Sequence, residues 1–107
     1  MPLNQDLVVN GQAHIVARER DIEVQLRRSM VDSTSDVTRD AAYINKVAER
    51  IACVRCSKPL VSSEQCTLAM RIELYVAEDI KAPVLIDKLL CLLQGLGYAI
   101  TDKPFLT

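Results

Sequence analysis

The sequence predicts an α+β fold, a two-layer sandwich in which one mainly antiparallel sheet carries two helices on one face. Residues 21–27 and 66–77 alternate between apolar and polar side chains, as half-buried strands do, whereas residues 35–54 and 83–96 repeat apolar side chains at helical spacing. The four prolines are scattered, and no repeat or Pro/Gly-rich linker interrupts the 107 residues. We therefore expect a single domain over residues 1–107 with the element order β-β-β-α-β-α-β.

The first two strands are expected to form a hairpin. The apolar residues 7–9 precede the Asn-Gly pair at positions 10 and 11, and the mainly apolar segment 12–17 follows it. This dipeptide readily adopts the two positive φ angles of a type I′ turn, which joins antiparallel strands. The turn is therefore predicted at these two residues.

The third strand is expected over residues 21–27, with its apolar side chains on one face of the sheet. A single helix over residues 12–30 is the alternative, because Ile15, Ile22, Leu26 and Met30 lie near helical spacing. The strict alternation favours the strand.

The first helix is expected over residues 35–54. Ser33 is followed three residues later by Asp36, as in a capping box at a helix start. Acidic residues lie near the expected start and basic residues near the expected end, which suits the helix dipole. Its apolar positions form one stripe: Val37, Ala41, Ile44, Ala48 and Ile51.

The remaining elements follow a connector at residues 57–63. The strand from Cys66 places five apolar side chains on one face: Leu68, Met70, Ile72, Leu74 and Val76. Pro83 suits the first turn of the second helix, and two glycines at positions 95 and 97 are typical of its end. A last short strand is expected over residues 98–101.

The four cysteines are the one group with a metal-binding pattern. Cys53 and Cys56 have the spacing by which two thiolates hold a zinc ion, and Cys66 with His14 would complete a Cys₃His set. No second motif of this kind exists. We therefore expect four structural thiols, with Cys66 and Cys91 in the core, and no metal or other cofactor.

The chain shows none of the residue patterns typical of common enzymes. Only three glycines occur, and those at 95 and 97 end a helix, whereas a phosphate loop opens one. His14, the only histidine, has no nucleophile of recognisable context. The protein is therefore expected not to be an enzyme.

Charge argues against nucleic acid as the partner. Thirteen basic and fourteen acidic side chains leave a net charge of −1, whereas nucleic-acid binders usually carry excess positive charge. The alternative function is a zinc-stabilised module that contacts nucleic acid through four arginines: Arg18, Arg20, Arg27 and Arg28.

The helix at residues 84–96 is apolar over most of its circumference. One stripe contains Leu85, Leu89, Leu92 and Leu96, and a second contains Ile86, Leu90 and Leu93. A helix that lies on one sheet needs only one stripe, so this helix is either packed centrally, against both the helix at residues 37–51 and the sheet, or it presents one stripe to a partner. We therefore expect a non-enzymatic binding or regulatory protein that acts through protein contacts as a homodimer, with this partner interface: Leu85, Ile86, Leu89, Leu90, Leu93 and Leu96.

The sequence carries no secretory signal, lipidation motif or membrane-spanning segment. The longest run of large apolar residues and cysteine, at residues 89–93, is far shorter than the ~20 residues that a span requires. A soluble, cytoplasmic protein is expected.

Overall fold

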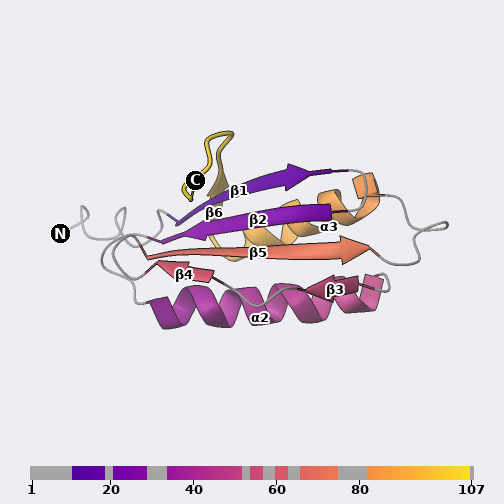
Figure 1. Ribbon diagram of the computed structural model, residues 1–107, viewed down its shortest axis with the longest axis horizontal. Helices are drawn as coiled ribbons and strands as arrows, with labels where there is room; N and C mark the ends of the chain where they lie inside the picture. The colour runs from indigo at the N-terminus through magenta and orange to yellow at the C-terminus, as the bar shows by residue number, and fades with distance from the viewer. Residues whose placement is uncertain are drawn as a thin grey trace.

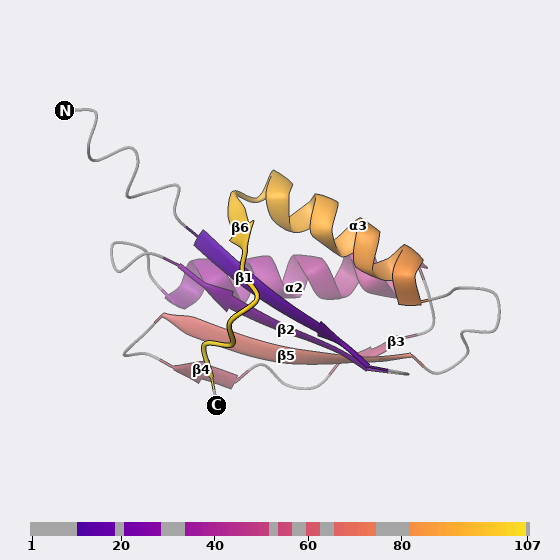
Figure 2. The same ribbon diagram turned by 90° about the horizontal axis from the view of Figure 1, so that it is seen from above.

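A computed structural model shows the α+β sandwich, and it describes residues 11–18, 21–28, 34–51, 54–56, 60–62, 66–74 and 82–106. Helices α2 (Thr34–Ile51) and α3 (Ala82–Gly95) lie on the same face of one mixed sheet (Figures 1 and 2). The strands are β1 (Gly11–Ala17), β2 (Asp21–Arg27), β3 (Val54–Cys56), β4 (Leu60–Ser62), β5 (Thr67–Leu74) and β6 (Tyr98–Ile100). The predicted fold class is confirmed.

The centre of the sheet is formed by β5, β2 and β1, which are antiparallel neighbours. β6 joins the sheet beside β1 and runs parallel to it. On the other side, β3 and β4 each pair with a different part of β5. Since β5 and β6 point the same way, α3 is the crossover that links them.

Beyond the paired residues of β1 and β2, the backbone N–H of Arg18 donates to the carbonyl of Asp21 at 2.6 Å. Gly11 was expected in a turn with Asn10, between strands at residues 7–9 and 12–17, but it is the first residue of β1 and pairs with Tyr98. Among the described residues, only Cys66 and Gly97 have a positive φ, so Gly11 does not have the positive φ that a type I′ turn requires. The expected strand at residues 7–9 lies outside the described residues.

Packing explains why glycine stands at position 11. A Cβ atom there would lie 2.9 Å from Cδ1 of the Tyr98 ring, closer than side chains normally approach. The absence of a side chain lets the buried ring lie over the start of β1. The predicted turn is therefore wrong at Gly11, where glycine provides space for the ring, and Asn10 lies outside the described residues.

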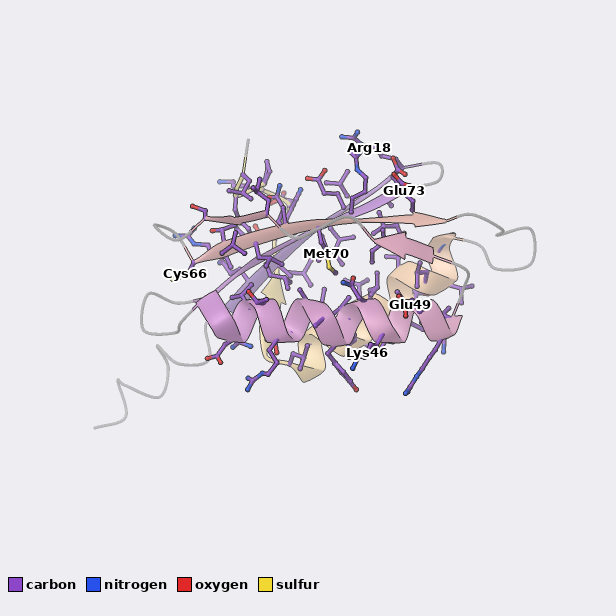
Figure 3. The ribbon with its side chains drawn as sticks, turned by 60° about the horizontal axis from the view of Figure 1, so that its bottom comes forward. Arg18, Lys46, Glu49, Cys66, Met70 and Glu73 are labelled. Atoms are coloured by element: carbon purple, nitrogen blue, oxygen red, sulfur yellow. The ribbon has the colours of Figure 1, made fainter. Side chains whose placement is uncertain are left out.

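The core lies between the sheet and the two helices. The predicted stripe of α2 is confirmed, since Val37, Ala41, Ile44 and Ala48 are buried and Ile51 packs against them. Figure 3 shows Met70 pointing from β5 toward α2, while Lys46 lies on the outer side of the helix. The other buried apolar residues of the sheet are Ala13, Ile22, Val24, Leu26, Leu68, Ile72 and Tyr98.

The sequence predicted no strand between α2 and β5. Two three-residue strands form there, β3 and β4, and the latter falls within the predicted connector. Three residues show too little alternation to indicate a strand, so only their pairing with β5 defines them. Within the described residues, neither helix is long and apolar enough to cross a membrane.

Candidate functional site

The sheet-facing side of α3 matches neither of the two stripes read from the sequence, because it takes residues from both. Leu85, Leu89 and Leu93 have no exposed surface, and they follow one another at four-residue intervals. Three of the six residues assigned to a partner interface are therefore core residues of the subunit. The other three, Ile86, Leu90 and Leu96, are half-buried and remain accessible to a partner.

A groove of about 440 Å³ runs between the outer sides of α2 and α3. Its walls are Val47, Arg50 and Ile51 of α2 and Asp87, Lys88 and Cys91 of α3. In helical projection, Ile86 and Leu90 fall on the flank of α3 that faces away from these residues. The groove is therefore a separate surface from the accessible part of the predicted interface.

Two exposed apolar side chains extend the groove along its helices. Tyr43 is 51% exposed and lies one turn before Val47, and Val84 is 48% exposed and lies one turn before Lys88. The groove also carries charges of both signs, because Arg50, Lys88 and Asp87 all line it. The helical layer thus presents apolar and charged contacts together.

A second cluster links β2, α2 and β6 in the interior. The guanidinium of Arg28 forms an ion pair with Asp40, and the Tyr98 hydroxyl donates to the same carboxylate oxygen at 3.0 Å. The guanidinium carbon of Arg28 lies 4.8 Å from the centre of the Tyr98 ring. Burial raises the pKa of Tyr98 above its ordinary value, and the negative charge of Asp40 acts in the same direction. The Arg28 guanidinium lowers the pKa of Tyr98, but burial outweighs it, so the phenol stays protonated and donates to Asp40.

A third cluster covers the face of the sheet opposite the helices. After β6, residues 101–106 cross this face over β1 and β2 (Figure 2). The Gln25 side-chain oxygen accepts from the backbone N–H groups of Phe105 at 2.6 Å and Leu106 at 3.2 Å, and its nitrogen donates to the Leu106 carbonyl at 3.1 Å. Near the start of the segment, His14 Nδ1 lies 3.0 Å from the Thr101 carbonyl oxygen. We call residues 101–106 the strap.

Comparison with protein-family models, with curated proteins and with solved structures gave no match. The clusters themselves are therefore the basis for a functional argument.

The predicted zinc ligands do not converge. Cys56 pairs with Ile72, near the end of β5, whereas Cys66 immediately precedes β5. Six residues of strand separate these positions by about 20 Å. Figure 3 shows this separation, with Cys66 and Glu73 at opposite ends of β5. Among the described residues, no group of three or more His, Cys, Asp or Glu could hold a metal ion; Cys53 lies outside them.

Two cysteines differ from the expected core thiols. Cys66 occupies a turn with a φ of 48° and is half-buried, and Cys91 is exposed on α3. Cys91 lies on the groove side of α3. Because most residues of this helix are apolar, the sequence alone could not predict which side Cys91 occupies.

The four arginines of the nucleic-acid alternative are not equivalent. Arg28 is committed to the ion pair with Asp40, and Arg27 lies over the Phe105 ring with its guanidinium carbon 5.7 Å from the ring centre. Arg18 is exposed, and Arg20 lies outside the described residues. The described arginines therefore do not act as one uniform basic patch.

Sequence reasoning missed Asp40 and Gln25, although one of them left a signal. Asp40 lies within the apolar stripe of α2, three residues after Val37 and four before Ile44, so a polar residue there indicates a buried partner. Gln25 alternates with apolar residues and resembles any solvent-facing strand residue. The strap covers it in the folded chain.

Proposed function

We propose that this chain is a small, non-enzymatic binding or regulatory protein that acts through protein contacts and self-associates as a homodimer. The groove between α2 and α3 carries the proposal. Its lining is mainly apolar, and two exposed apolar side chains, Tyr43 and Val84, lie one helical turn before groove residues Val47 and Lys88.

The occupant proposed for the groove is the same groove of a second copy. A two-fold axis brings identical surfaces together, so such a surface must be complementary to itself. Arg50 and Lys88 supply positive charge and Asp87 supplies negative charge on the same walls, which allows ion pairs across the axis. Half-exposed Tyr43 is of the residue type that most often anchors such contacts.

The required area is modest. A stable interface of ordinary size buries roughly 800 Å² on each partner. The subunit has 7041 Å² of accessible surface, so about a tenth of it would be covered.

Sedimentation velocity with paired variants tests the proposal. We expect the unmodified protein to be a dimer at about 50 µM and Val47→Glu to be a folded monomer with an unchanged circular dichroism spectrum, because the charge enters the groove and not the core. Leu90→Glu is the matched control, since it places the same charge on the opposite flank of α3. It should leave the dimer intact.

Two results would contradict the proposal. A monomeric unmodified protein at this concentration would rule out the homodimer. Dissociation by Leu90→Glu, with Val47→Glu still dimeric, would move the interface to the other flank of α3.

A further inference from the structure

The strap is held almost entirely through its main chain. Gln25 contacts two N–H groups and one carbonyl, and His14 contacts a carbonyl, so none of these bonds depends on which side chains the strap carries. The carboxamide of Gln25 accepts and donates as the peptide group of an adjacent strand would. Any extended peptide could form the same bonds.

One contact selects a side chain. The guanidinium of Arg27 lies over the Phe105 ring, which favours an aromatic residue at this point. The side chains of Asp102, Lys103 and Pro104 are exposed and contribute little.

The surface under the strap continues beyond it. The strand register places His14, Gln25, Ala69 and Leu60 in one row across β1, β2, β5 and β4 on the open face. The strap covers the first two positions, which are 7% and 3% exposed. Leu60, at the far end of the row, is 67% exposed. The row therefore has a polar, occupied half and an apolar, accessible half.

We propose that this row is a binding site for an extended segment of a partner protein, and that the strap occupies half of it in the free chain. The partner segment carries an aromatic residue over Arg27, followed by aliphatic residues over Ala69 and Leu60. Three strand spacings separate His14 from Leu60, about 14 Å, which about five extended residues span. A partner of this chemistry reproduces the main-chain bonds of the strap and also covers Leu60, which the strap leaves exposed.

The site lies on the face of the sheet opposite the α2–α3 groove and does not depend on the proposed homodimer. The site recognises the backbone groups of the partner segment, together with its aromatic and aliphatic side chains. The strap and the partner compete for Gln25. The apparent affinity for the partner segment is therefore the intrinsic affinity multiplied by the fraction of molecules in which the strap is open.

Fluorescence anisotropy tests this site with the intact chain. The probe is a labelled peptide with the sequence of residues 101–107 followed by two leucines. We expect saturable binding to the unmodified protein and about tenfold tighter binding to Phe105→Ala, because the loosened strap no longer competes. Leu60→Ser should weaken binding by about tenfold, because one leucine contact is lost.

The controls and opposing outcomes are specific. Lys46→Ala changes an exposed side chain on the outer side of α2 and should leave the affinity unchanged, as should Gln12→Ala on the open face outside the row. No anisotropy change up to about 1 mM peptide with either the unmodified protein or Phe105→Ala would overturn the proposal. So would binding that is insensitive to Leu60→Ser.

Sedimentation separates a partner segment from a second copy of this chain. If the occupant is a partner segment, Phe105→Ala leaves the oligomeric state unchanged. A dimer that dissociates on this replacement would instead show that subunits exchange straps, and it would overturn the assignment to a different protein.

Discussion

Single residues decide how the ends of three elements meet. Asp40 is buried on α2 and contacts two other residues, Arg28 and Tyr98. Arg28 directly follows β2, and Tyr98 is the first residue of β6. Removing one member of a buried charge pair leaves the other without compensation. This differs from an exposed pair, which water screens.

Asp40→Asn should therefore lower the free energy of unfolding by about 3 kcal/mol. Asp36→Asn is the matched control on the same helix, because Asp36 pairs with Arg39 at 3.6 Å in an exposed position. The control should cost less than about 1 kcal/mol. Urea unfolding at neutral pH measures the free energy of unfolding of both variants. Equal decreases would show that the buried ion pair stabilises the fold no more than the exposed one.

Tyr98 should make stability depend on alkaline pH. Because burial raises its pKa in the folded chain, the native state keeps the phenol proton at a pH where the unfolded chain has lost it. The free energy of unfolding should fall as pH rises above the ordinary value of 10.0. Tyr98→Phe should show a shallower fall between pH 9 and about 11 in urea titrations. An identical slope in both proteins would contradict this assignment.

At the scale of elements, close approach between β1 and β6 depends on a residue with no side chain. The Tyr98 ring occupies the space that a Cβ of Gly11 would need. The Tyr98 ring is buried, so it cannot move aside as easily as the tip of a long, flexible side chain could. The parallel pairing of β6 with β1 should therefore be sensitive to this one position.

Gly11→Ala should lower the free energy of unfolding by about 1–3 kcal/mol through overpacking. Gly95→Ala is its control, because a Cβ at Gly95 would meet nothing within 4 Å. That replacement should be neutral or raise stability by up to about 1 kcal/mol. Thermal unfolding of both variants measures the contrast, and a stable Gly11→Ala protein would mean that the ring can shift.

At the scale of the molecule, the two faces of the sheet serve different contacts. The helical layer covers one face and carries the groove, and the strap crosses the other (Figure 2). If the groove is the homodimer interface, the thermal midpoint of unfolding should rise with protein concentration, since association stabilises the folded state. A midpoint independent of concentration between about 5 and 200 µM would contradict a dimer.

The sequence by itself determined the fold class, the long elements and most of the core. Strict alternation around Val24 and Met70 and the stripe of Val37 to Ala48 each describe one face of one element, and such patterns are local. The rotation of α3 about its axis could not be predicted from such a local pattern. Its leucines encircle the helix, so only packing against the sheet selected Leu85, Leu89 and Leu93 for the core.

Tertiary structure alone decided the sites. Gly11 looked like a turn residue until Tyr98 lay against it, and Gln25 looked like an exposed strand residue until residues 101–106 covered it. Cys56 and Cys66 are close in sequence but lie at opposite ends of β5. In each case the deciding neighbour is distant in the chain or placed by strand register, and periodicity reports only which face a residue occupies, not what lies above it.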